Sequence, residues 1–217
     1  MKISLINAGK RFNRDWIFRN IHQEFISGLA YAITGPNGSG KSTLLQVIGG
    51  AMMMSEGEAK YAIGDGQLAI GKEEKPREVH VDQAFKYISI AAPYLELIEE
   101  MTLLEFLHFH EKFKPFLPTI GIPHIITAIG LKAAAQKQIR FYSSGMKQRV
   151  KLAQAIFSNV PCVLLDEPCT NLDAAGIELY HQLIRDHCNN RLIIVSSNDE
   201  QEYSFCKERI SITDFKK

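Results

Sequence analysis

Nine consecutive residues near the N-terminus have the pattern of a phosphate-binding loop. They satisfy G-x-x-x-x-G-K-[ST] and stand where an apolar, strand-like run gives way to a helix-like one. Glycines let the backbone curl, so that successive N–H groups and the start of the helix converge on a phosphate. The lysine adds positive charge at the β- and γ-phosphates, and the hydroxyl after it binds Mg²⁺. The predicted phosphate-binding residues are Gly35, Pro36, Asn37, Gly38, Ser39, Gly40, Lys41, Ser42 and Thr43.

A second candidate site is the apolar run 162–165, which ends in the acids Asp166 and Glu167. On a parallel sheet beside a phosphate loop, Asp166 can hold Mg²⁺ together with Ser42. Glu167 would then polarise, or take a proton from, the nucleophile that attacks in line with the γ-phosphate. We therefore predict that Asp166 is a metal ligand and that Glu167 is catalytic.

The elements that position these residues follow from apolar periodicity. Strands are expected over 2–8, 17–25 and 29–34, and a helix over 41–49. Short strand-like pieces follow at 59–63, 67–70 and 87–90, with a solvated loop over 72–77. Between 93 and 159 the chain becomes helical, with helices at 123–129 and 146–157 and one helical face made by Leu103, Phe106, Leu107 and Phe113.

Strands and helices alternate again in the last third of the sequence. Strands are predicted at 162–165, 192–196 and 209–212, with helices at 175–188 and 199–207. This alternation is typical of a mostly parallel sheet covered by helices on both faces. The predicted fold class is therefore α/β, of the P-loop NTPase type, with a helical insertion.

Composition limits the function classes. The 217 residues are 46% apolar and 23% charged, which suits one globular domain with a substantial core. The formal charge of +1 gives no electrostatic case for a nucleic-acid partner. No apolar run approaches the roughly 18 residues of a membrane span, and the start does not have the pattern of a signal peptide, so a cytosolic location is expected. The four cysteines lack C-x-x-C spacing and are expected to be buried thiols: Cys162, Cys169, Cys188 and Cys206.

Further motifs resemble those of a known family. The segment Tyr142–Arg149, YSSGMKQR, resembles the LSGGQ-x-QR signature of the ATP-binding-cassette (ABC) ATPases, and Asn171-Leu172-Asp173 is similar to their D-loop. The resemblance covers essentially the whole chain, with four motifs in order. It implies one ABC ATPase domain over 1–217, with an N-terminal antiparallel β portion. The catalytic core would comprise 1–92 and 160–217, and 93–159 would be the helical subdomain that carries the signature.

The same resemblance implies roles for further residues. Phe12 would stack on adenine, with Trp16 as a weaker candidate, and the alternative is that Phe12 is a core residue of an edge strand. Two cassettes would form a head-to-tail dimer around ATP, with Asp173 at the nucleotide site. The residues expected to contact the γ-phosphate held by the other subunit are Ser143, Ser144, Gly145 and Met146.

Three departures from the family pattern bear on activity. The signature has Ser144 in place of a glycine and Met146 in place of a glutamine. The segment 88–94 lacks the family's Q-loop glutamine, and Pro93 or one of the two alanines before it stands in its place. Asn198 aligns with the switch histidine, and an amide can bind a phosphate but cannot carry a proton. These changes predict slow hydrolysis, unless a nearby residue substitutes.

The resemblance implies a specific assembly. The chain would be the ATP-binding and ATP-hydrolysing subunit of an ABC transporter on the cytoplasmic face of a membrane, with ATP and Mg²⁺ as its ligands. Its partners would be a separate membrane permease and a second cassette, identical or different, with no nucleic acid. The alternative is a soluble ABC ATPase that acts as a mechanical clamp on a ribosome, nucleic acid or a cell-surface assembly. A P-loop kinase or GTPase would leave 143–149 and 171–173 without a role.

Overall fold

The computed structural model describes residues 1–64 and 76–216 and contains two β-sheets. One sheet has five parallel strands in the order β6-β7-β8-β3-β9. The other has four antiparallel strands in the order β2-β1-β4-β5. The strands are β1 (Lys2–Phe12), β2 (Asp15–Ile26), β3 (Ala30–Thr34), β4 (Glu56–Ile63), β5 (Arg77–Val79), β6 (Ile88–Ala91), β7 (Cys162–Asp166), β8 (Leu192–Ser196) and β9 (Glu208–Ser211). The mostly parallel sheet and the N-terminal antiparallel portion are both confirmed.

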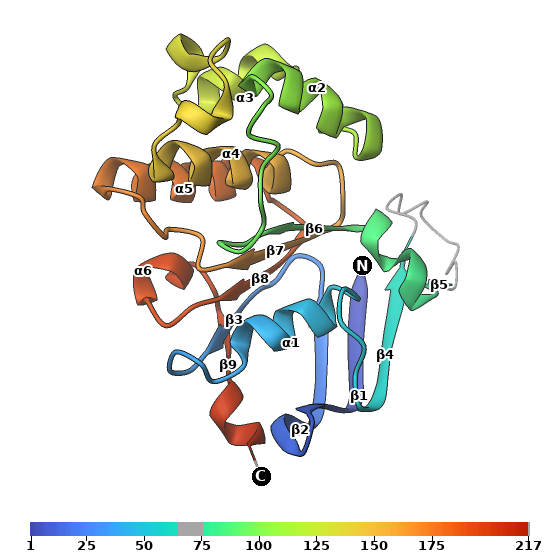
Figure 1. The fold of residues 1–217 in the computed structure, drawn as a ribbon. Coiled ribbons are helices and arrows are strands. Elements are labelled where there is room, and N and C mark those ends of the chain that lie inside the picture. The colour runs from blue at the N-terminus through green and yellow to red at the C-terminus, as the bar shows by residue number, and fades with distance from the viewer. Residues whose placement is uncertain (65–75, 217) are drawn as a thin grey trace.

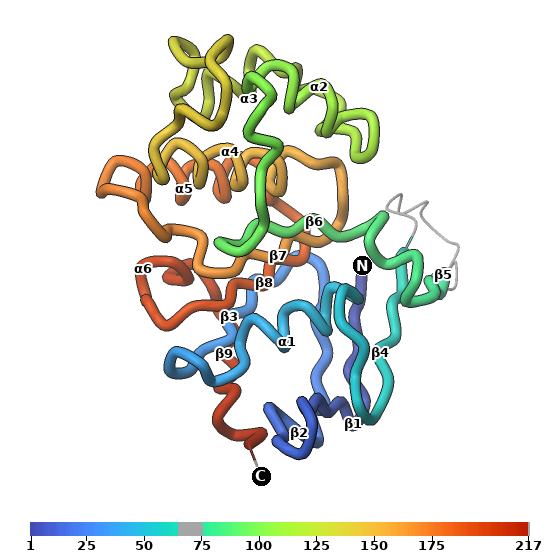
Figure 2. The backbone as a smooth tube through the Cα atoms, viewed as in Figure 1, coloured from blue at the N-terminus to red at the C-terminus, as the bar shows by residue number. Residues whose placement is uncertain are grey.

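Helices cover the parallel sheet on its two faces (Figure 1). The α-helices are α1 (Lys41–Ile48), α2 (Leu103–Phe113), α3 (Ile122–Ala128), α4 (Ser144–Ile156), α5 (Ala174–His187) and α6 (Glu200–Tyr203). Short 3₁₀ helices lie at Val81–Lys86, Lys132–Ala134, Ile139–Phe141 and Ile212–Phe215. After β6 the chain leaves the sheet and runs up into α2, which begins the helical layer (Figure 2).

Two apolar cores lie on opposite faces of the parallel sheet. Successive strand residues point to opposite sides. Val163 and Leu165 of β7 therefore pack with residues of α2, α3, α4 and α5. Cys162 and Leu164, which alternate with them, pack with α1 and the antiparallel sheet. The sheet thus separates α1, into which the candidate phosphate loop leads, from α4, which begins with the candidate signature.

Side-chain caps set where the main helices begin. Thr102 and Glu105 form a reciprocal capping box at the start of α2. The Ser143 Oγ accepts the Met146 N–H at the start of α4, and Asp173 caps α5 in the same way. These caps satisfy backbone N–H groups that have no partner within the helix.

Several predicted boundaries were wrong. β1 continues through irregular pairing to Phe12, because β2 pairs with it over this whole length and β4 pairs with it as far as Gly9. β5 begins at Arg77, inside the segment expected to be a loop, and pairs with β4. Phe113 is 74% exposed rather than on the buried face of α2, and α6 is a single short turn. The strand predicted at 67–70 and the loop residues 72–75 lie outside the described residues.

All four cysteines are buried free thiols, as expected. Burial raises the pKa of Cys162, Cys169 and Cys206 to about 12 and that of Cys188 to about 11. Among the helices of the described chain, none is long and apolar enough to span a bilayer.

Candidate nucleotide-binding and catalytic site

The predicted phosphate loop connects β3 to α1. Lys41 is 5% exposed, and its Nζ donates to the carbonyl oxygens of Gly35 at 2.9 Å and Pro36 at 3.2 Å. The Ser39 N–H donates to the Pro36 carbonyl at 3.1 Å, which closes a tight turn. The ammonium group is therefore held over the loop, at the start of α1, where a phosphate would bind.

Gly40 is required for this loop to pack against β2. Its φ is 100°, and a Cβ added there would lie 2.2 Å from the Ile17 Cγ2. Ile17 belongs to β2, so the antiparallel sheet touches the phosphate loop directly. A side chain at this position would have to displace one of the two segments.

Asp166 lies at the end of β7, opposite Ser196 of β8, and is 1% exposed. Its Oδ1 has no hydrogen-bond partner in the described chain, and the same holds for the buried hydroxyls of Ser196 and Ser39. Leaving buried polar atoms unpaired is costly. Mg²⁺ binds few carboxylate oxygens alongside hydroxyls, phosphates and water. An unpaired carboxylate oxygen at the end of β7 would suit such an ion, and Ser42, in the first turn of α1, is the candidate for a second ligand.

Glu167 follows directly and faces the loop. It lines a cavity of about 240 Å³ together with Ile17 and residues 37–43. Its backbone has a φ of 42°, and its N–H donates to the Ser196 carbonyl at 2.9 Å. A non-glycine residue rarely adopts this conformation, and such strain is typical of functional sites.

Asn198, two residues after Ser196, the last paired residue of β8, also lies at the loop. Its Nδ2 donates to the Asn37 Oδ1 at 3.2 Å. The structure therefore brings together the phosphate loop, Asp166, Glu167 and Asn198, on elements that are far apart in the sequence.

The candidate signature residues form a second group. They line a cavity of about 490 Å³ that also includes Arg149 and Asn171–Asp173. A Cβ on Gly145 would lie 2.9 Å from the Asn171 carbonyl oxygen, so glycine allows α4 and the loop before α5 to approach. The Asp173 carboxylate accepts the Gly176 N–H at 2.8 Å and lies 3.6 Å from the Arg149 guanidinium. None of the residues lining this cavity lines the cavity at the phosphate loop.

The pairing of β1 with β2 places Phe12 and Trp16, the two candidates for stacking on adenine, on opposite faces of the sheet. Arg11 pairs with Trp16, and Phe12 pairs with Asp15. Phe12 therefore shares the face of Asp15, and Trp16 is on the opposite face. The pairing shifts register between Lys10 and Arg11, which leaves Ile17 as an extra residue in β2, and Ile17 contacts the phosphate loop. There the guanidinium groups of Arg11 and Arg19 lie over the Trp16 ring.

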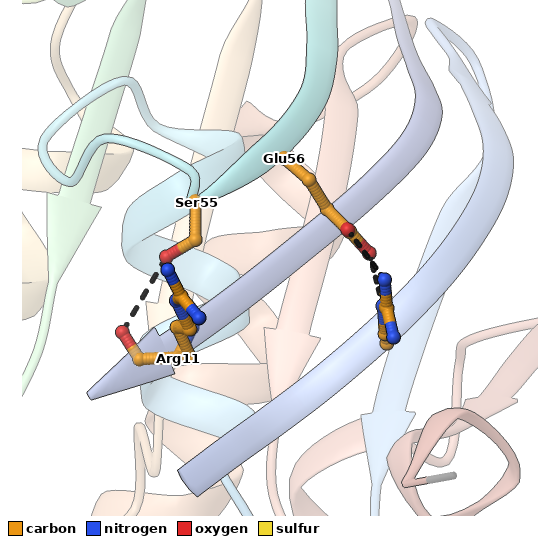
Figure 3. Close-up of polar contacts among 4 residues, drawn as sticks. Arg11, Ser55 and Glu56 are labelled. Atoms are coloured by element: carbon orange, nitrogen blue, oxygen red, sulfur yellow. Dashed lines mark hydrogen bonds and ion pairs between the residues drawn. The ribbon is translucent and has the colours of Figure 1, made fainter. Parts of the chain in front are cut away.

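The strand end that carries Phe12 is braced by the start of β4. The Ser55 Oγ bonds both the N–H and the carbonyl of Arg11, at 3.1 and 3.4 Å, as Figure 3 shows. Glu56, drawn beside it, forms a bidentate pair with Arg19 at 2.6 and 3.0 Å. Phe12 itself is 46% exposed, and the Lys10 Nζ lies 5.0 Å from the centre of its ring.

The segment that lacks the glutamine is tied to α4. The Pro93 carbonyl accepts from the Lys151 Nζ at 2.7 Å, and Glu99 pairs with Lys147 at 2.6 Å. Sequence reasoning missed the next residue, Tyr94. Burial raises the pKa of its hydroxyl, the nearby Gln46 side chain opposes this shift, and the charge of Asp166 adds to it.

Sequence reasoning also missed two buried polar residues, Gln148 and Glu202. Both contact the loop that follows β7. The position of Gln148 within the signature-like segment could have identified it as a functional residue. No feature of the sequence around Glu202 indicates a functional role.

Comparison with known proteins agrees with this geometry. The family described as ABC transporter matches residues 18–170. The chain is 27% identical over 202 residues to the ABC transporter ATP-binding protein YybJ of Bacillus subtilis, covering 92% of this chain and 87% of YybJ. It is 30% identical over 203 residues to the cytochrome c biogenesis ATP-binding export protein CcmA of Agrobacterium fabrum, covering 92% and 90%.

Solved structures share the fold. A dimeric bacterial ABC transporter cassette superposes with a TM-score of 0.77 at 23% identity, covering 96% of this chain and 93% of that one. The same cassette in a post-hydrolysis state with ADP and Pi superposes equally well. The chain therefore belongs to the ABC transporter family, and its fold is that of the family's ATP-binding cassettes.

Proposed function

We propose that this chain binds and hydrolyses ATP as one of two cassettes in an ABC transporter. The observation that carries the proposal is the position of its two groups of candidate residues. The phosphate loop leads into α1 on one face of the parallel sheet, whereas Ser143–Met146 begin α4 on the other face. One chain thus holds two separate half-sites. A second cassette, placed head to tail, would complete each half with the other.

The residues at the phosphate loop have the chemistry that this function needs. Loop N–H groups and Lys41 would hold the ATP phosphates, and the face of Phe12 would support the base. Ser42 and Asp166 would hold Mg²⁺, which when bound neutralises phosphate charge. Glu167 would orient and deprotonate the attacking water.

Asn198 sets the expected rate. Its amide can donate to a phosphate oxygen from its place beside Asn37, but it cannot carry a proton. We therefore propose that ATP binding and dimer closure proceed and that hydrolysis is slow. A purified protein that turns over several times per second and is indifferent to Asn198→Ala would refute this.

The permease is proposed from the relatives. YybJ is an ABC transporter ATP-binding protein and CcmA is an ATP-binding export protein. By analogy this chain would sit on the cytoplasmic face of a membrane and bind a separate permease. The second cassette could be identical or different.

The test is a pull-down from solubilised membranes with Glu167→Gln, in ATP and Mg²⁺. Blocked hydrolysis should hold the closed dimer on its partner, and Lys41→Ala, which weakens phosphate binding, is the matched control. Recovery of a multi-span membrane protein with Glu167→Gln, but not with Lys41→Ala, would support the transporter. Recovery of ribosomal or other soluble factors alone would replace it with the clamp.

A further inference from the structure

One peptide group in the loop after β7 is held from both sides by buried side chains. The Pro168 carbonyl accepts from the Gln148 Nε2 at 2.8 Å. The Cys169 N–H, which belongs to the same peptide group, donates to the Glu202 Oε1 at 2.7 Å. Gln148 is 3% exposed and Glu202 is 5% exposed, so water does not compete freely for either bond.

The two side chains come from different parts of the site. Gln148 lies in α4, whose first turn is the candidate signature. Glu202 lies in α6, which follows Asn198. The peptide between them comes directly after Glu167 and shortly before Asn171–Asp173. The clamped peptide is therefore the point at which both half-sites of the chain are joined.

The loop needs such a restraint. Glu167 has a φ of 42° and Asn171 has a φ of 65°, so the backbone is in the left-handed region on both sides of the clamped peptide. Each such residue costs free energy that the surroundings must offset. Hydrogen bonds made in a buried setting, one of them to a carboxyl group, can supply it.

Glu202 is itself fixed in place. Its carbonyl accepts from the hydroxyl of Tyr180, which is fully buried in α5, at 2.8 Å. Burial raises the pKa of the Glu202 carboxyl, and the hydrogen bond from the Cys169 N–H acts in the opposite direction. The other carboxyl oxygen, Oε2, has no hydrogen-bond partner among the described residues. Burying a carboxyl group and an amide is unfavourable unless they are bonded, and the peptide is a bonding partner for both.

We propose that Gln148 and Glu202 are positioning residues for ATP hydrolysis. By holding the 168–169 peptide, they place Glu167 at the phosphate loop of their own chain and Asn171–Asp173 at the surface that meets the second cassette. The inference rests on the proposed ATPase function.

The test replaces the Gln148 and Glu202 side chains with methionine, which has a similar length but cannot make either hydrogen bond. Gln148→Met and Glu202→Met remove the hydrogen bond, Glu202→Gln keeps an acceptor oxygen, and Glu200→Gln, at the exposed start of α6, is the matched control. Single-turnover hydrolysis of radiolabelled ATP gives the rate at saturation and the ATP concentration for half-maximal rate. Hydrogen exchange of the Cys169 amide reports the clamp independently of activity.

We expect each methionine variant to lower the saturating rate at least tenfold, with the half-maximal ATP concentration changed less than twofold. Glu202→Met should accelerate Cys169 amide exchange at least tenfold. Glu202→Gln and Glu200→Gln should stay within threefold of the wild type in both measurements. Gln148→Asn and Glu202→Asp, which shorten each side chain by one methylene, should lower the rate in the same direction if a methionine variant does not fold.

Three results would overturn the inference. These are an unchanged rate in folded clamp variants, a change confined to the ATP concentration dependence, and equal damage from Glu202→Gln and Glu202→Met. A wild-type protein that hydrolyses no ATP would instead refute the proposed function. In that case Cys169 exchange would still show whether the clamp exists.

Discussion

Replacing Gly40 with alanine should damage the phosphate loop in two separable ways. The new residue would sit at a φ of 100°, and its Cβ would lie 2.2 Å from the Ile17 Cγ2. The left-handed backbone costs about 1–2 kcal/mol, and overpacking costs about 1–3 kcal/mol more. Gly38→Ala is the matched control, because Gly38 has a φ of 72° with nothing within 4 Å of an added Cβ.

These costs can be measured as lost folding stability plus lost ATP affinity. Urea unfolding gives the first, and titration calorimetry with ATP gives the second. For Gly38→Ala, the losses of unfolding and ATP-binding free energy should sum to about 1–2 kcal/mol, which is roughly a 5- to 30-fold rise in Kd if the whole loss falls on binding. For Gly40→Ala, the same sum should be about 2–5 kcal/mol. Adding Ile17→Ala to Gly40→Ala removes the Cγ2 of Ile17. The double variant should recover the free energy lost to overpacking but not the cost of the left-handed backbone. Equal losses from the two glycine variants, or no recovery from Ile17→Ala, would refute the reasoning.

Three further predictions address other groups. Asn198→His should raise the rate of hydrolysis about tenfold or more, because an imidazole can carry a proton; a steady-state ATPase assay would contradict this if the rate stayed level. Phe12→Ala should weaken ATP binding by about 1–3 kcal/mol, whereas Trp16→Ala should change it little. If a fluorescent-nucleotide titration shows the larger loss of affinity for Trp16→Ala, Trp16 is the residue that stacks on adenine. Burial lowers the pKa of His110 to about 4, so its folded form resists protonation. The contribution of neutral His110 to the free energy of unfolding should be complete above pH 6.5 and should fall by up to roughly 3 kcal/mol as the pH drops towards 4. Urea unfolding at a series of pH values should show this fall, and His110→Gln should make it smaller.

Local sequence was sufficient where local chemistry decides the structure. The phosphate loop follows from its glycines and lysine. The start of α2 carries a local signal of the same kind, Thr102 and Glu105 three residues apart, which sequence reasoning missed. The alternation of strands and helices also predicted the parallel sheet, because each element carries its own apolar periodicity.

Contacts between distant segments could not be predicted in this way. The bond between Cys169 and Glu202 spans 33 residues, and that between Gln148 and Pro168 spans 20. β5 is three residues long with a charged start, and only its pairing with β4 makes it a strand. Tyr94 comes near Asp166 because β6 and β7, which lead to these two residues, are neighbours in the sheet.

The burial of the four cysteines makes fluorescence labelling of the unaltered chain practical. Thiol probes react with the thiolate, and with pKa values of about 11 to 12 less than roughly one native thiol in a thousand is ionised near pH 7.5. A cysteine introduced at an exposed position such as Met53, which is 86% exposed, would react far faster. Donor and acceptor dyes placed there on two cassettes would report their approach on addition of ATP, with every native thiol left in the core.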